Sequence, residues 1–294
     1  MDLTSDYPTP NHENGEGMKQ RFRVALAQIN CQRGDKEANT QKIEEYTKRA
    51  KQQNADLVIF PELSLTGYML GDELYKLAET IPGPSTNRIE RIAQEQEAYI
   101  IFGMPELSEK TQATLYNTAV IVGPQGLIGR YRKMYLPTHS VFEEKRYFRQ
   151  GHHVGVFETD LGRIGLIICY DVFFPEVSRL TRLEGAQLII CISASPAVRK
   201  AFFETLTVAR AMENTAFLAY VNLVGIEDGL QFWGGSRLVG PNGRIIVSAK
   251  YDEEDLVIGE IDYTEIRQVE PFVPTLKDLR PEIFDKLKEK AENL

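Results

Sequence analysis

The sequence predicts an α/β fold in which mixed β-sheets pack against each other and are covered by helices. Short apolar runs that are typical of buried strands alternate with segments whose apolar residues recur at helical spacing. Three pairs of strand-like runs are joined by short Gly-containing turns, which predicts antiparallel hairpins. The hairpins exclude a wholly parallel sheet, and packed mixed sheets accommodate the complete set of elements.

The size and composition indicate one folded domain preceded by a leader. The chain has 294 residues, of which 43% are hydrophobic, and α/β domains of this size commonly bury a single core. Residues 1–20 are rich in Pro, Gly, Asn and acidic residues and have no periodic apolar pattern. We therefore expect residues 1–20 to be a disordered leader.

The first half of the chain alternates strands with helices. The run from Phe22 to Cys31 is mostly apolar and predicts a strand, and Ile43, Tyr46 and Ala50 recur at helical spacing in the segment that follows. Further on, the sequence predicts a strand at 56–60, a helix at 87–98, a strand at 99–104, and two strands within 115–133 that turn at 123–126.

The second half continues the pattern with two more hairpins, which turn at 160–162 and 240–243. Apolar strands are predicted at 186–194 and 217–225. The helix between them, at 203–215, has apolar side chains roughly on one face: Leu206, Ala209, Ala211 and Met212.

The charge and the absence of targeting signals argue against several function classes. With 34 basic and 42 acidic residues the formal charge is −8, so nucleic acid is not expected as a partner, because phosphate binding needs a basic surface. No apolar run reaches the roughly 20 residues that span a bilayer, and no secretion signal is recognisable. We expect a cytoplasmic protein with no membrane partner.

The cysteines and histidines do not predict a metal site. Cys31, Cys169 and Cys191 are widely spaced and suit neither a disulfide framework nor a zinc site, so we expect reduced thiols. The four histidines have neither nearby cysteines nor an i, i+4 partner. We therefore expect no metal and no cofactor.

Polar residues with complementary chemistry stand at or near the ends of apolar strands. Cys169 ends the run GLIIC, Glu62 follows DLVIF, and Lys133 ends LIGRYRK, with Glu144 in a loop shortly afterwards. A thiolate attacks carbonyl or nitrile carbon, but it needs a base and a stabilising cation. A buried Glu can take the thiol proton, while a Lys ammonium and the backbone N–H of Tyr170 can hold an oxyanion.

Each of these residues also has an ordinary structural interpretation. Most free cysteines are small buried hydrophobic residues, which is our expectation for Cys31 and Cys191. Glu62 after Pro61 suits the N-terminus of a helix, and Lys133 in the basic run RYRK suits a solvated surface position. The combination of base, cation and thiol at strand ends favours the catalytic interpretation.

Three sequence blocks carry a resemblance to a known family. They are FPELSLTGY (60–68), RYRKMYLP (130–137) and GLIICYDVFFPE (165–176). In their order and spacing they resemble the signature blocks of the nitrilase, or carbon–nitrogen hydrolase, superfamily, and three blocks together are far more specific than one short motif. The resemblance extends over roughly residues 22–265.

The resemblance implies roles for the strand-end residues. Glu62 would be the general base, Lys133 the oxyanion stabiliser and Cys169 the nucleophile. Glu144 fits the family's second glutamate, with the adjacent Glu143 as its rival.

The resemblance also implies the architecture and the assembly. It predicts an αββα sandwich in a domain spanning 21–265, which pairs with a second copy into an αββα-αββα homodimer or a higher oligomer. Helices at about 175–185 and 203–214 would form the dimer surface, although these faces could equally pack on their own sheet. The C-terminal extension, 266–294, would reach toward the partner subunit.

The residues after the nucleophile favour an amide as the substrate. Tyr170-Asp171 follows Cys169, as in amidase-like branches of the family, whereas true nitrilases more often have Trp-Glu there. The expected reaction is hydrolysis of a small linear amide to a carboxylic acid and ammonia through a cysteine thioester. Nitrile hydrolysis and N-carbamoyl amine hydrolysis are the alternatives.

Two downstream segments, 192–200 and 221–245, are similar to the glutamine-hydrolysing domain of some NAD synthetases. This similarity points to glutamine-like or other short amides, or to shared ancestry alone. Tyr68, Phe173, Ser195 and Trp233 are candidates for the substrate site; for Ser195 and Trp233, turn formation and burial are equally good interpretations.

Functions of other classes fit the sequence less well. A catalytically silent interaction protein would not need the base, the lysine, the thiol and the second glutamate together. Acyl-transferring relatives usually show membrane attachment, which the sequence does not predict. A redox role would need a second cysteine near Cys169, and neither Cys31 nor Cys191 is predicted to be close.

Overall fold

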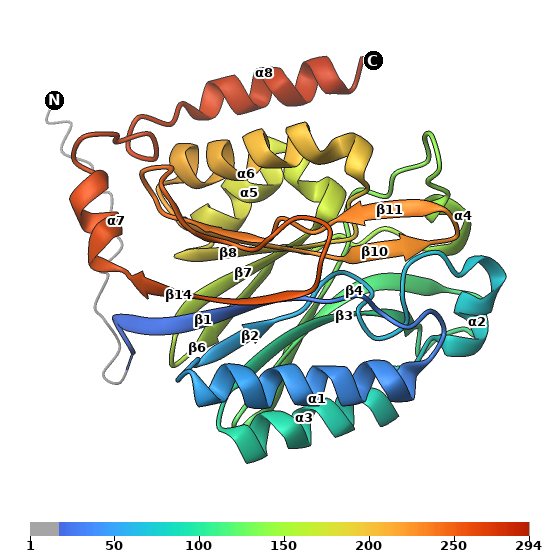
Figure 1. Cartoon of the computed structure of the whole chain (residues 1–294). Coiled ribbons are helices and arrows are strands. Elements are labelled where there is room, and N and C mark those ends of the chain that lie inside the picture. The colour runs from blue at the N-terminus through green and yellow to red at the C-terminus, as the bar shows by residue number, and fades with distance from the viewer. Residues whose placement is uncertain (1–17, 294) are drawn as a thin grey trace, which may run out of the picture.

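Two six-stranded β-sheets pack face to face, and helices cover the outer face of each, as Figure 1 shows. The structure is a computed structural model that describes residues 18–293. The αββα sandwich implied by the sequence is confirmed. The predicted leader, 1–20, lies outside the described residues except at its end, where the Lys19 ammonium pairs with Asp56 at 2.6 Å.

The first sheet has the strand order β14-β1-β2-β3-β4-β5. Its strands are β1 (Arg21–Gln28), β2 (Leu57–Ile59), β3 (Tyr99–Leu107), β4 (Leu115–Gly123), β5 (Gly126–Arg132) and β14 (Asp255–Asp262). The strands β1, β2 and β3 are parallel, and the other neighbours are antiparallel. The sheet is therefore mixed, as the hairpin turns predicted.

The second sheet has the order β13-β12-β9-β8-β7-β6. Its strands are β6 (Gly155–Thr159), β7 (Gly162–Ile168), β8 (Leu188–Ser193), β9 (Phe217–Asn222), β12 (Arg237–Val239) and β13 (Ile245–Ser248). Here β7, β8 and β9 are parallel, so their carboxyl ends meet at one edge of the sheet. A separate two-stranded hairpin consists of β10 (Val224–Glu227) and β11 (Leu230–Trp233).

Two long helices cover each sheet. These are α1 (Lys36–Gln52) and α3 (Pro84–Gln96) on the first sheet, and α5 (Pro175–Leu183) and α6 (Lys200–Asn214) on the second. The helix α1 begins after Asp35, whose side chain accepts the Ala38 N–H at 2.9 Å. The helices α3 and α5 begin with proline, whose fixed φ suits the first helical position.

Short helical segments connect the main elements, and two helices follow the last strand. The connecting segments are η1 (Gly71–Glu73), α2 (Leu74–Leu77), α4 (Glu144–Tyr147), η2 (Cys169–Phe173) and η3 (Ala197–Arg199). The last two helices are α7 (Thr264–Val269) and α8 (Pro281–Ala291), and every residue of α8 is exposed.

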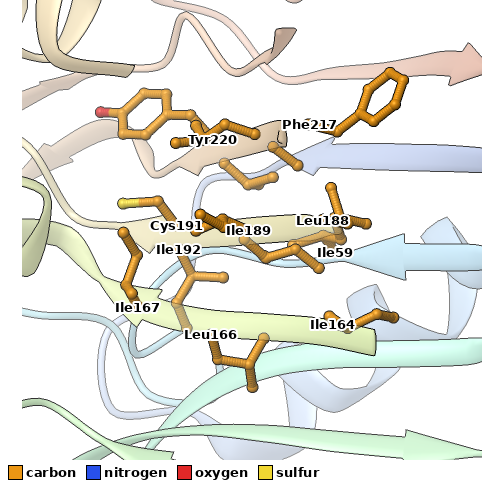
Figure 2. Close-up of a cluster of buried hydrophobic side chains, with 14 of the residues drawn as sticks. Ile59, Ile164, Leu166, Ile167, Leu188, Ile189, Cys191, Ile192, Phe217 and Tyr220 are labelled. Carbon is orange, nitrogen blue, oxygen red and sulfur yellow. The ribbon is translucent and has the colours of Figure 1, made fainter. Parts of the chain in front are cut away.

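The main hydrophobic core lies between the two sheets. Figure 2 shows part of it, including Ile59 of the first sheet and, from β7, β8 and β9, Leu166, Ile189 and Phe217, which belong to the same cluster. A second cluster packs the first sheet against α1 and α3. Because strand residues alternate between faces, β1 contributes Leu26 to the first cluster and Ala25 to the second.

The three predicted hairpins are confirmed, and one predicted strand is wrong. The antiparallel pairs β4–β5, β6–β7 and β12–β13 match the predicted turns. The segment predicted as one strand at 217–225 divides at Leu223 into β9, in the second sheet, and β10, in the separate hairpin. The break coincides with Asn222, whose side-chain amide donates to Ser195 O and Gly234 O and so fixes the chain where the two strands part.

Candidate functional site

The predicted catalytic residues come from both sheets and meet where the parallel strands end. Glu62 follows β2, and Lys133 follows β5, both in the first sheet. Cys169 follows β7 in the second sheet. A bond across the sandwich joins the two sets, because the backbone N–H of Ala194, which follows β8, donates to Glu62 Oε2 at 2.7 Å.

Glu62 is buried and accepts three hydrogen bonds. Its Oε1 accepts from Lys133 Nζ at 2.6 Å and from Asn117 Nδ2 at 2.7 Å, and its Oε2 accepts the Ala194 N–H. A carboxylate offers about four acceptor positions, so one position on Oε2 is left. Glu62 belongs to a turn, so the alternative of a helix N-terminal acid is wrong.

A glycine in the neighbouring strand makes room for this turn. A Cβ atom at Gly103 of β3 would lie 2.8 Å from the Cα of Glu62, closer than real Cβ contacts come. The backbone of the turn can therefore lie directly on β3. Its bonds include the Leu65 N–H donating to Gly103 O at 3.1 Å, so the position of Glu62 is set by backbone packing.

Lys133 lies between two carboxylates and is fully buried. Its ammonium donates to Glu62 Oε1 at 2.6 Å and to Glu144 Oε1 at 2.7 Å. Burial alone would lower its pKa, but Glu144 and Glu62 together raise the pKa of Lys133 well above its ordinary value. Lys133 is therefore a cation at neutral pH, and the solvated surface position is excluded for it.

The other cations of the RYRK run have a separate role. Arg132 and Arg130 form ion pairs with the buried carboxylate of Glu106. In contrast, Tyr131 and Lys133 face the site, and the Tyr131 hydroxyl donates to Asp171 Oδ2 at 2.8 Å. The alternation of side chains along a strand thus separates the structural arginines from the lysine of the site.

Glu144 is the first residue of the short helix α4. Of the two neighbouring glutamates, Glu143 and Glu144, it is the one whose side chain enters the site. Its Oε1 accepts from Lys133 and from the Tyr68 hydroxyl, the latter at 2.6 Å. Its Oε2 is buried and has no hydrogen-bond partner among the described residues. Burial raises the pKa of Glu144 to about 7, against the opposing effect of Lys133. The rival Glu143 is exposed and pairs with Arg146.

Cys169 has a backbone conformation that is unusual for a residue with a side chain. Its φ is +46°, in the left-handed region, and it begins η2 directly after β7. Asp171 fixes the turn, because its carboxylate accepts the N–H groups of Ile168 and Tyr135, each at 2.9 Å. Strained positions of this kind cluster at functional sites, where the surrounding structure holds them.

The Cys169 thiol is nearly buried, and its surroundings oppose ionisation. Burial raises the pKa of the thiol well above its ordinary value, Glu62 raises it further, and Lys133 opposes both. The group is therefore a neutral thiol that needs a base to become a nucleophile. Tyr170 follows in the first turn of η2, where backbone N–H groups have no acceptor within the helix.

Cys191 lies closer to Cys169 than the sequence predicted. It sits on β8 opposite Ile167 of β7, two residues before Cys169. The Cys191 thiol adds to the raised pKa of the Cys169 thiol, while burial raises the pKa of Cys191 and a hydrogen bond from the Cys169 backbone N–H acts to lower it. The expectation that Cys191 is distant is therefore wrong, because strand pairing brings it underneath the turn. Cys31, Cys169 and Cys191 are all free, as expected, and Cys31 and Cys191 are buried, as expected for small hydrophobic residues. Cys191 packs among the apolar side chains of Figure 2.

A small cavity of about 170 Å³ opens onto Cys169. It is lined by Pro137, His139, Phe142, Cys169, Tyr170, Phe173, Pro196, Arg199 and Phe203. Its walls are largely aromatic, and it is smaller than the roughly 300–1,000 Å³ of pockets for drug-sized ligands. A second cavity is lined by Tyr68, Glu144 and Arg33 among others.

The four predicted substrate residues are not all brought together. Phe173 lines the Cys169 cavity, whereas Tyr68 lines the second cavity and reaches the site through Glu144. Ser195 and Trp233 line neither cavity; they are buried, and Trp233 Nε1 donates to Ser195 Oγ at 3.3 Å. That bond fits their structural interpretation.

Several residues of the site were not found from the sequence. Asn117 and the Ala194 N–H bind Glu62, and Asp171 holds the cysteine turn. The carboxylate of Glu227, on β10, accepts the N–H groups of Tyr68 and Met69, each at 2.8 Å, and so anchors the tyrosine that binds Glu144. Asp171 lies within a signature block, but the other contacts depend on tertiary packing and leave no local pattern.

Within residues 18–293 we find neither a metal-binding cluster nor a membrane-spanning helix. No group of three or more His, Cys, Asp or Glu side chains in this range is arranged to hold a metal ion. No helix in the same range is long and apolar enough to cross a membrane.

Comparison with known proteins places this architecture in a family. Residues 23–271 match the carbon-nitrogen hydrolase family. A nitrilase from Pyrococcus abyssi is 35% identical over 270 residues, which cover 89% of this chain and 98% of that protein. A glutamine-dependent NAD(+) synthetase from Aquifex aeolicus is 34% identical over 259 residues, which cover 84% of this chain but only 43% of that protein.

A solved structure shares the fold and has an active-site cysteine. It is a mutant of an amidase from Nesterenkonia sp. AN1, in which the acetamide moiety of fluoroacetamide is added covalently at the active-site cysteine. It has a TM-score of 0.79 and 27% sequence identity, and the alignment covers 90% of this chain and 96% of the amidase. The chain therefore belongs to the carbon–nitrogen hydrolase family of the nitrilase superfamily, and it is an enzyme of that class.

Proposed function

We propose that the protein hydrolyses the C–N bond of a small linear amide, giving a carboxylic acid and ammonia through a thioester on Cys169. The observation that carries the proposal is the buried Lys133 ammonium, which bridges Glu62 and Glu144 and acts electrostatically on the Cys169 thiol, while Cys169 itself lines a small cavity. A base, a cation and a thiol in one water-poor site are the groups that acyl transfer to cysteine requires.

In the first step Glu62 takes the thiol proton as the Cys169 sulfur attacks the amide carbon. The acceptor position left on Glu62 Oε2 is the natural place for this proton, because Oε1 already accepts from Lys133 and Asn117. The high pKa of the thiol requires proton transfer to accompany the attack, since a free thiolate is scarce at neutral pH.

The tetrahedral intermediate carries a negative oxygen that needs hydrogen-bond donors. An ammonium has three N–H bonds, and Lys133 uses two for Glu62 and Glu144, which leaves the third for the oxyanion. The backbone N–H of Tyr170 is the second donor in our proposal. Removing one such donor in other enzymes typically slows the reaction about 10²- to 10³-fold.

Collapse of the intermediate breaks the C–N bond, and the proton held by Glu62 passes to the departing nitrogen, which leaves as ammonia. A water molecule then attacks the thioester, with Glu62 accepting its proton. The C–S bond breaks, the sulfur regains the proton, and the carboxylic acid is released. The unpartnered Glu144 Oε2 is a suitable acceptor for the N–H groups of the amide.

Nitrile hydrolysis is the second candidate, because relatives such as the P. abyssi protein are named nitrilases. Our preference for amides rests on Tyr170-Asp171 after the cysteine. Asp171 is a buried acceptor for Ile168, Tyr135 and Tyr131, so in our proposal its role is to hold the turn that carries Cys169. Hydrolysis of N-carbamoyl amines is compatible with the same catalytic groups.

Measuring ammonia release from a panel of compounds tests the proposal. The panel contains short linear amides, glutamine, N-carbamoyl amines and the nitriles that match the amides in carbon number. We expect turnover of the amides and none by the Cys169→Ala variant. Ammonia from the nitriles alone would replace the amidase assignment by a nitrilase assignment.

We further propose that two copies pair through α5 and α6 and that α8 contributes to the contact. These helices lie on one side of the molecule in Figure 1 and expose large apolar side chains. The exposed residues are Leu180 and Leu183 of α5, Phe202 and Met212 of α6, and Ile283, Phe284 and Leu287 of α8. A helix with an apolar stripe and no buried residue needs a further surface to cover it.

Sedimentation equilibrium tests this assembly. The wild-type chain is expected to sediment as a dimer or a larger oligomer, and Leu180→Asp is expected to shift it toward the monomer. A monomeric wild-type protein at micromolar concentration would contradict the proposal.

The cytoplasm is the compartment we propose, because it keeps the Cys169 nucleophile reduced.

A further inference from the structure

A cation without an anionic partner lines the cavity that holds Cys169. Arg199 ends η3, is partly buried, and contributes to the wall of this cavity. Within residues 18–293 its guanidinium has neither an ion pair nor a side-chain hydrogen bond. Its one aromatic contact is the Phe202 ring, whose centroid lies 5.8 Å away.

The cations around Arg199 are occupied by protein groups. Arg210 pairs with Glu213 at 3.1 Å, and Arg237 pairs with Glu204 at 3.2 Å. Lys200 lies over the Tyr251 ring, 3.3 Å from its centroid. Arg199 is thus the neighbouring cation that the fold leaves available to a ligand.

The rest of the cavity wall offers no counter-charge. Apart from Arg199, its lining residues are aromatic side chains, two prolines, His139 and the reactive cysteine, with no Asp or Glu among them. Holding an unpaired guanidinium against such a wall costs free energy, which an anionic ligand would offset. A guanidinium also matches a carboxylate in shape, through two parallel N–H···O bonds.

We propose that Arg199 binds a carboxylate at the far end of the substrate, so that the preferred substrate is the monoamide of a short dicarboxylic acid. This inference rests on the proposed amidase function, and it specifies the substrate class. It disfavours glutamine, because the α-ammonium of glutamine would find no carboxylate on the cavity wall. The small cavity limits the chain between amide and carboxylate to a few carbons.

The test compares anionic and neutral amides of equal length. The kcat/KM for succinamate is divided by the kcat/KM for butanamide, and the same ratio is formed for glutaramate and pentanamide. For wild type we expect the larger ratio to exceed 10. For Arg199→Gln we expect it to fall about 10- to 100-fold, the usual effect of losing a hydrogen bond to a charged group. Lys200→Gln is the matched control, because it removes the adjacent charge outside the cavity wall.

A charge reversal provides a second, positive readout. Arg199→Glu should favour an amide with a terminal ammonium, 5-aminopentanamide, over glutaramate, whereas Arg199→Lys should retain part of the anionic preference. Equal changes in all kcat/KM values for Arg199→Gln and Lys200→Gln, or no change in the ratio for Arg199→Gln, would overturn the proposal.

Binding without turnover separates this inference from the proposed function. Calorimetry with the Cys169→Ala variant should show succinamate or glutaramate binding that weakens at least tenfold when Arg199→Gln is added. If butanamide is hydrolysed but neither anionic amide binds, the amidase function stands and the inference fails. If the anionic amides bind through Arg199 but no amide is hydrolysed, the substrate site stands and the amidase function fails.

Discussion

The ammonium of Lys133 lies 2.6 Å from the carboxylate of Glu62, and neither side chain has any exposed surface. Such a pair is held at the cost of dehydrating both charges, which its attraction must offset. The fold supplies further bonds to the same atoms, from Asn117 and Ala194 to Glu62 and from Lys133 to Glu144. The charges are thus fixed before a substrate arrives, which is the arrangement that stabilises a transition state most effectively.

Replacing Cys169 by Ala should abolish ammonia release while preserving the fold. The side chain is small, so its loss changes packing little, but no other group can form the thioester. Ammonia assays and circular dichroism check the two expectations. Cys191→Ala is the matched control, because it removes a neighbouring buried thiol that is not proposed to react. Substantial activity in Cys169→Ala would show that the nucleophile is assigned wrongly.

Replacing Lys133 by Met should destabilise the protein by about 3–5 kcal/mol, because the buried carboxylates of Glu62 and Glu144 lose their cation. Urea unfolding measures this free energy. Adding Glu62→Gln should restore part of the stability by removing one unpaired charge, without restoring activity. A Lys133→Met protein as stable as wild type would argue against the buried network.

The pH dependence of kcat/KM should reflect the ionisation of the Glu144 carboxyl group. Because Glu144 is proposed to accept hydrogen bonds from the amide, the carboxylate is the active form, and kcat/KM should rise as the pH increases through about 7. The Tyr68 hydroxyl lowers the pKa of Glu144, so Tyr68→Phe should move this rise in kcat/KM, the acidic limb of the pH profile, to higher pH. Glu144→Gln should remove the limb. A limb unaffected by both variants would have to come from another group.

The contribution of Asp171 to the stability of the protein should fall as the pH rises from about 4 to about 6. Burial raises the pKa of Asp171 from 3.8 to about 6. Between these values the folded state binds more protons than the unfolded state, so stability is present below the window and is lost above it, by about 3 kcal/mol.

Urea unfolding of wild type and Asp171→Asn at pH 4 and pH 6 isolates this contribution. The variant should be less stable overall, because it disturbs the turn at Cys169. From pH 4 to pH 6 its free energy of unfolding should change by about 3 kcal/mol less in the destabilising direction than that of wild type. Equal changes in both proteins would mean that Asp171 keeps an ordinary pKa.

Local patterns predicted much of the fold, and long-range pairing was the part they could not supply. The Gly-containing turns at 123–126, 160–162 and 240–243 gave the hairpins directly, because such turns restrict the chain within a few residues. The pairing of β14 with β1 joins residues such as Arg21 and Asp262, which are far apart in the sequence. Nothing near Asp255–Asp262 indicates its partner, so that strand was missed.

The same distinction holds at the site. Glu62, Lys133 and Cys169 were predicted because they lie at or near strand ends in blocks that resemble a family, and Glu144 because it fits the family's second glutamate. The structure brings the three charged residues into contact. The ligands of Glu62 could not be predicted, because the Ala194 contact is made by a backbone group whose chemistry every residue shares. Likewise, whether Arg199 is available to an anionic ligand depends on which of the neighbouring charged side chains already pair with each other, and the sequence does not show this.

The bond from Ala194 to Glu62 crosses from one sheet to the other, and Cys169 follows β7 of the second sheet, whereas Glu62 and Lys133 follow strands of the first. Neither half of the chain can therefore hold a working centre by itself. Separately expressed halves should gain activity only on reassembly, and a ligand or substitution that separates the layers should silence the enzyme before its secondary structure melts. The rate of turnover therefore reports how well the two sheets are packed against each other.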